Sequence, residues 1–138
     1  MFKINGISVC IYLLLKYIVF FTVLAFVGDR FKHIVLDNAT THAEIFKLSL
    51  GYTLYVLIYT IPMILILFFP LQFILTLKST RWFIFLILLL YIAEYFIYTY
   101  LYASSDKSLG VYNLVIGVIL LWLFFYKIII IKFGTANI

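Results

Sequence analysis

The sequence is poor in charge, in cysteine and in the residues that interrupt helices. Only 11% of its 138 residues are charged, against about 25% in an average soluble domain. The single cysteine, Cys10, can close no intrachain disulfide. With two prolines and six glycines, long stretches are free to be helical. These shortages exclude a water-soluble fold and a disulfide-stapled scaffold.

Motifs that carry chemistry are also missing. The sequence holds no Gly-rich phosphate loop, no G-x-S-x-G nucleophile motif and no His pair within an apolar run that would hold a haem. His33 and His42 lie among acidic residues but lack metal-ligand spacing. We therefore expect no catalytic residue, no cofactor and no metal, and a protein that is not an enzyme. The net charge of +5 forms no basic cluster, so we expect no nucleic-acid partner.

Apolar residues dominate what is present. They make up 67% of the chain, and the mean hydropathy is +1.24. Four apolar runs are each long enough to cross a bilayer core, which takes about 20 residues. We predict an all-α integral membrane bundle of four transmembrane helices with short loops, forming a single polytopic membrane domain over 1–138, with helices near 7–27, 45–69, 82–102 and 109–131. The bilayer is thus its first partner, and we expect a bacterial cytoplasmic membrane.

The ends of the first two runs carry readable signals. A cleaved signal peptide is the alternative for the first run, but that run exceeds the 7–15 apolar residues typical of such signals and lacks an A-x-A-like site. Gly28 suits the position just past a helix end. The residues from Thr41 to Glu44 fit a capping box that starts the second helix.

Two prolines and two polar links bear on the other boundaries. Apolar sequence in the second run continues to Leu77, so its helix would be about 50 Å long, against a hydrocarbon core of about 30 Å. We expect a kink near Pro62 and an interfacial segment over 71–77 after Pro70. The residues 78–81 predict a tight turn, and those at 104–106 offer N-caps for the fourth helix.

The distribution of basic residues favours an orientation. With the N-terminus inside, the cytoplasmic side carries Lys3, Lys78, Arg81, Lys127 and Lys132. The outer side then carries Arg30, Lys32, Lys47 and Lys107. The positive-inside rule therefore predicts that both termini are cytoplasmic.

Lys16 and Glu94 are the first candidates for function, because an ionisable group inside a span costs a few kcal/mol. At 1.5 Å per residue they lie about 14 and 18 Å from the cytoplasmic ends of two parallel helices, so an ion pair is possible. The pair could fix helix register alone, Lys16 could instead snorkel with Glu94 protonated, or Glu94 could bind a cation or a proton.

Tyrosines surround this candidate site on the helical wheel. Tyr91, Glu94, Tyr95 and Tyr98 share an arc of about 100°, and Tyr59 belongs to a similar stripe with Tyr52 and Tyr55. If the stripes converge, they line a cavity open to the outer side with Glu94 at its floor. The alternative is that the phenols sit in an interfacial belt or pack between helices. Gly110 and Gly117 favour close helix packing.

Two classes of function stay open. A non-catalytic interaction or accessory subunit of a membrane complex, or an immunity-like protein, needs only helix faces to recognise its partner. A small transporter or flippase for a lipid-linked sugar or cation would work as a homo-oligomer.

In length and helix count the chain resembles the GtrA-type family of polyprenyl-linked sugar flippases, and the residues 78–83 (Lys-Ser-Thr-Arg-Trp-Phe) are similar to that family's basic, aromatic loop between helices two and three. The family's Asn-Arg pair is missing. The resemblance implies membrane movement of a lipid-linked sugar.

Overall fold

Every regular element in the described part of the chain is a helix. The computed structural model describes residues 3–27, 29–101 and 108–135. Its elements are α1 (Gly6–Val27), a short π-helix η1 (Lys32–Leu36), α2 (His42–Thr76), α3 (Thr80–Leu101) and α4 (Ser108–Thr135). The four long helices are apolar enough to span a membrane. The predicted all-α class with four spans and short loops is confirmed, and the chain is a multi-pass membrane protein.

The capping box at the start of α2 is present. The Glu44 N–H donates to Thr41 Oγ1 at 3.3 Å, and the Thr41 N–H donates to Glu44 Oε2 at 3.3 Å. Thr41 itself is extended, with φ −128° and ψ 159°. Both side chains therefore satisfy backbone N–H groups that the first helical turn leaves without partners.

α2 is longer than the predicted span, because it continues through both prolines. Its 35 residues stay helical past Pro62 and Pro70, so the helix does not break at either. The segment predicted to be interfacial, 71–77, is continuous with the rest of α2 up to Thr76. Leu71, Ile74 and Leu75 are buried in the core, and burial of side chains of this size offsets the one backbone hydrogen bond that each proline removes.

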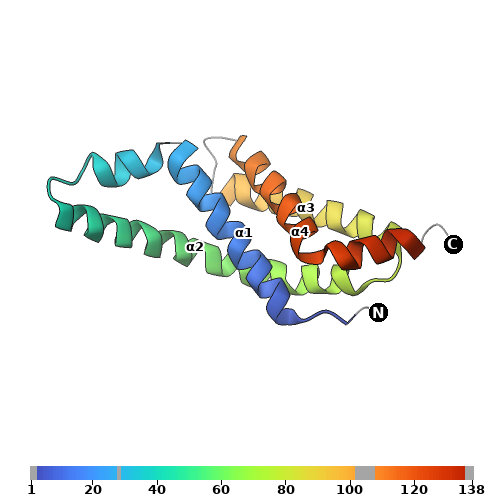
Figure 1. Cartoon of the computed structure of the whole chain (residues 1–138). Coiled ribbons are helices and arrows are strands. Elements are labelled where there is room, and N and C mark those ends of the chain that lie inside the picture. Colours follow the sequence, from blue (N-terminus) through green and yellow to red (C-terminus); the bar gives the residue numbers. More distant parts are fainter. Residues whose placement is uncertain (1–2, 28, 102–107, 136–138) are drawn as a thin grey trace.

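A break in helical geometry occurs instead in α4. Phe125 has φ −120° and ψ 17°, and the ribbon of α4 bends along its length (Figure 1). The Phe125 side chain is 4% exposed and packs edge-on against Tyr12 at 5.8 Å. The bend keeps the last turns of α4 alongside the end of α2, where Lys132 makes its contacts.

The links between the helices are short where the structure describes them. Past α1, Asp29 adopts φ +50°, a left-handed conformation that short polar residues tolerate. Asn38 Nδ2 donates to the carbonyls of His33 and Ile34 at 2.8 and 3.1 Å, closing the end of η1. Gly28 and the predicted caps at 104–106 lie outside the described residues.

α1 lies at the centre of the bundle. It packs against both α2 and α4, while α3 packs against α4 and the end of α2. The start of α1, the turn between α2 and α3 and the end of α4 lie at one end of the molecule (Figure 1). At the opposite end, the first half of α2 extends beyond α3 and α4 with η1 beside it (Figure 1).

Candidate functional site

A buried ion pair joins α1 to α3. Lys16 Nζ lies 2.6 Å from both carboxylate oxygens of Glu94, and each side chain is only 1% exposed. Charge-assisted hydrogen bonds of this length are among the strong ones in proteins. The depth estimate from the sequence thus placed the two groups within reach, and the structure holds them in contact.

Two further donors complete the surroundings of the carboxylate. The Tyr17 hydroxyl donates to Glu94 Oε1 at 2.7 Å, and Asn113 Nδ2 donates to the same oxygen at 2.9 Å. The ammonium also lies 5.3 Å from the centre of the Tyr91 ring, within range of a cation–π attraction. Three helices, α1, α3 and α4, therefore meet at this carboxylate.

Glycines of α4 make the close approach possible. A Cβ at Gly117 would lie 2.9 Å from Lys16 Cε and 3.3 Å from the Tyr91 ring. The Tyr12 hydroxyl donates to the Gly117 carbonyl at 2.9 Å and lies 3.3 Å from the Tyr91 hydroxyl. About two turns nearer the start of α4, a Cβ at Gly110 would meet the Tyr95 ring at 2.6 Å. Small residues thus let the helices pack against the polar cluster.

The other predicted tyrosines do not gather around Glu94. Tyr98 is buried and packs edge-on against Phe20 at 4.9 Å, while Tyr95 is half-buried beside Gly110. Tyr59 is 39% exposed and its ring packs against Tyr55.

The predicted Tyr-lined cavity is not formed. With Glu94 1% exposed, no cavity opens onto its carboxylate in the part of the chain that the structure describes. Lys16 and Tyr17 of α1 occupy the space that the helical wheels of the second and third helices had left open.

Two buried oxygen atoms near the cluster have no hydrogen-bond partner. They are Asn113 Oδ1 and Thr99 Oγ1, in side chains that are 0% and 4% exposed. Thr99 Oγ1 would lie 2.9 Å from a Cβ at Gly110, and Asn113 is one turn from that glycine, a separation of about 5–6 Å between Cβ positions. The two oxygens therefore lie in the same layer between α3 and α4.

A second buried cation, Lys132, lies near the C-terminal end of α2. Lys132 Nζ donates to the carbonyl of Leu75 at 2.9 Å and to the carbonyl of Leu77. It lies 4.4 Å from the centre of the Phe83 ring, and the residue is 0% exposed. From the sequence, Lys132 was expected only as one of the basic residues on the cytoplasmic side. It instead caps the carbonyl end of α2, where the helix dipole favours a cation.

Sequence reasoning missed three partners of the cluster. Tyr12 lies one turn before Lys16 and shares its face of the helix, whereas Tyr17 adjoins Lys16 in the chain and points about 100° away from it. Asn113 lies on the fourth helix, and nothing in the sequence around it points to the carboxylate of Glu94. A polar stripe on the first helix was the available signal, because buried polar groups need partners.

Comparison with protein-family models, with curated proteins and with solved structures gives no match. The resemblance to GtrA-type flippases is therefore not supported by a family match, and the structure itself carries the functional argument.

Proposed function

We propose that this chain is a non-catalytic interaction subunit of the bacterial cytoplasmic membrane, which binds another membrane protein through an exposed face of α2. The partner is a resident subunit of a larger complex or, for an immunity-like protein, an invading protein within the bilayer. The observation that carries the proposal is the distribution of burial along α2. Every buried residue of this helix lies at or after Thr60, so the first 18 residues, 42–59, add none to the core.

This first half is not explained by the chain's own packing. At 1.5 Å per residue α2 is about 52 Å long, well beyond a hydrocarbon core of about 30 Å. Lipid contact alone would favour a uniformly bulky surface, yet the stretch contains Gly51, which is exposed and whose missing Cβ faces open space within the chain. Glycine in a helix interior costs about 1 kcal/mol relative to alanine, and in membranes it favours close approach of a second helix.

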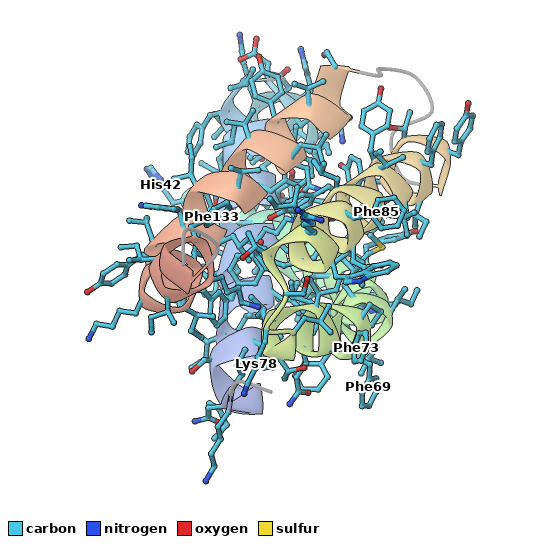
Figure 2. All side chains as sticks on the ribbon, turned by 90° about the vertical axis from the view of Figure 1, so that its right-hand side faces the viewer. His42, Phe69, Phe73, Lys78, Phe85 and Phe133 are labelled. Atoms are coloured by element: carbon cyan, nitrogen blue, oxygen red, sulfur yellow. The ribbon has the colours of Figure 1, made fainter. Side chains whose placement is uncertain are left out.

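The residues around Gly51 form one face. At 100° per residue they share the side of α2 that is turned away from its buried residues, and we call them the outer face of α2: Gly51, Leu54, Tyr55, Ile58, Leu65 and Phe69. The five side chains are between 53% and 74% exposed. Phe69 points away from the other helices (Figure 2). The outer face of α2 therefore offers a partner helix a small residue, aromatic side chains and bulky aliphatic groups.

The polar cluster supports the same reading. The carboxylate of Glu94 accepts hydrogen bonds from Lys16, Tyr17 and Asn113, so its charge is balanced within the chain. An enclosed pair whose carboxylate accepts four hydrogen bonds fits a role in holding α1, α3 and α4 together. What remains for recognition is the outer surface of the helices.

Site-specific photo-crosslinking in living cells tests the proposal. A photoreactive residue at Leu54, which is 53% exposed, is compared with one at Ile92 of α3, which is 57% exposed. We expect one crosslinked protein of defined mass from Leu54 and none from Ile92. The substitution Gly51→Leu should abolish this crosslink, whereas Gly134→Leu, at a second glycine with open space around it, should leave it intact. Crosslinks that survive Gly51→Leu would contradict the proposal.

A second candidate, a small oligomeric transporter or flippase, is favoured by one observation. The unpartnered oxygens of Asn113 and Thr99 lie in the layer next to the ion pair, where intramembrane polar groups mark transport pathways in other proteins. The substitution Glu94→Gln distinguishes the two candidate functions. A transporter should lose its activity and the pH dependence of that activity, while an interaction subunit should lose only stability. A crosslinked product of twice the chain's mass at Leu54 would favour the homo-oligomer.

A further inference from the structure

A pocket opens between the second half of α1 and the first half of α2. Its volume is about 250 Å³, and its walls are mostly apolar. The main lining side chains are Phe21, Ala25, Phe31, Tyr52, Val56 and Leu57. Thr22 and Thr53 also line it, but their hydroxyls donate to carbonyls of their own helices at 2.7 and 2.9 Å. We call this space the α1–α2 pocket.

The pocket lies on the side of α2 opposite the proposed docking face. Its α2 residues are 52, 53, 56 and 57, whose spacing continues the buried face of the helix, whereas Gly51, Leu54 and Ile58 point the other way. A ligand in the α1–α2 pocket would therefore leave the outer face of α2 free. The two sites are separate in space and in the residues that form them.

Two basic residues, Arg30 and Lys32, flank the lining residue Phe31 in the chain. Arg30 directly precedes Phe31, whose ring packs edge-on against Tyr52 at 6.3 Å. The Arg30 guanidinium is near enough to the Tyr52 hydroxyl to interact with it electrostatically. Lys32, the next basic residue, is exposed. An apolar pocket thus has one cation near its lining residue Tyr52 and a second one next to Phe31 in the chain.

The neighbouring acids are largely engaged elsewhere. Asp37 pairs with His33 at 3.0 Å, and Glu44 accepts hydrogen bonds from Thr40 and Thr41 in the capping box. Among the described residues, neither Arg30 nor Lys32 forms an ion pair with a carboxylate, although Asp29 adjoins Arg30 in the chain. The positive charges of Arg30 and Lys32 are therefore available to an anion.

We propose that the α1–α2 pocket binds an anionic phospholipid, with an acyl chain inside the pocket and the phosphate held by Arg30 and Lys32. An acyl chain matches apolar walls that open between two membrane-spanning helices. Arginine forms paired hydrogen bonds with phosphate, and basic residues at the membrane surface select anionic headgroups. The lipid joins α1 to the half of α2 that the protein core does not reach.

The test measures lipid binding to the purified protein in mild detergent by native mass spectrometry. Phosphatidylglycerol is compared with phosphatidylcholine carrying the same acyl chains. We expect phosphatidylglycerol to bind more tightly, and Arg30→Gln to weaken it about fivefold, the change expected for one basic residue at an anionic membrane surface. The matched control is Lys47→Gln, an exposed residue of α2 outside the pocket, which should change nothing.

A second variant tests the pocket itself. Val56→Trp fills the cavity, so it should reduce binding of both lipids while Arg30→Gln reduces only that of the anionic one. Glycerol phosphate without acyl chains should not bind. Equal binding of the two lipids by the unaltered protein would overturn the proposal. So would an effect of Lys47→Gln as large as that of Arg30→Gln, or full binding after Val56→Trp.

Discussion

At the level of single residues, the cost of burying charge governs the centre of this protein. Lys16 and Glu94 are each 1% exposed, and removing an ion from water costs several kcal/mol even in relaxed proteins. The cost is met because the carboxylate accepts four hydrogen bonds, two of them from the ammonium. Neither ion is therefore stable in the protein without the other.

The substitution Glu94→Gln should accordingly destabilise the protein by about 3–5 kcal/mol, the usual cost of leaving one buried charge without its partner. The double variant Lys16→Met, Glu94→Gln should recover most of this loss, because the amide oxygen can still accept from Tyr17 and Asn113. Unfolding by denaturant in detergent micelles measures both changes. A single variant as stable as the unaltered protein would contradict the structural role of the pair.

At the level of helices, stability depends on what meets the ends and faces of each helix. Lys132 of α4 donates to the carbonyls of Leu75 and Leu77 at the end of α2. Lys132→Met should cost about 1–3 kcal/mol, since the buried carbonyls would lose their donor. Lys127→Met, at an exposed position of the same helix, is the control and should have little effect. Faster hydrogen exchange over 71–77 in Lys132→Met alone would locate the loss.

The approach of α4 to α1 depends on Gly117. A methyl group there would lie 2.9 Å from Lys16 Cε and 3.0 Å from Nζ. The ammonium cannot retreat without leaving Glu94, so Gly117→Ala should destabilise the bundle by about 1–3 kcal/mol, as overpacking does elsewhere. Gly51→Ala has open space and should be neutral or slightly stabilising. Equal thermal stability of the two variants in detergent would show that α4 can shift freely.

At the level of the whole molecule, four candidate spans predict that both ends of the chain lie on one side of the membrane. The start of α1, the α2–α3 turn and the end of α4 share one end of the bundle (Figure 1). That end carries Lys3, Lys78 and Arg81, so the positive-inside rule predicts that it is cytoplasmic. Lys132 adds less to the exposed positive charge of this end than its sequence position implied, because its ammonium group is buried against α2.

Fusions of reporter proteins test this topology. A fluorescent protein at either terminus should fold and fluoresce in the cytoplasm, whereas a phosphatase inserted at Asn38, between η1 and α2, should be active outside. Reporters on opposite sides for the two termini would mean that one of the four helices does not cross the bilayer. Both termini outside would show that the basic residues do not set the orientation.

The sequence by itself determined the features that neighbouring residues encode. Apolar runs of sufficient length specify the four spans, because each backbone polar group in lipid must be satisfied within its own helix. The capping box at Thr41 and Glu44 lies within four residues of chain, so the local pattern was enough. The depth of Lys16 and of Glu94 followed from counting along two helices.

Only the tertiary structure decided which helix faces meet. Around Glu94 of α3 lie two residues of α1, 77 and 78 positions away, and one of α4, 19 positions away. Hydropathy does not predict how each helix is rotated about its own axis to bring these residues together. The same holds for Lys132 at the end of α2 and for the burial of Leu71 beyond Pro70. These contacts depend on how side chains of distant helices interlock, and that packing energy is a property of the assembled bundle.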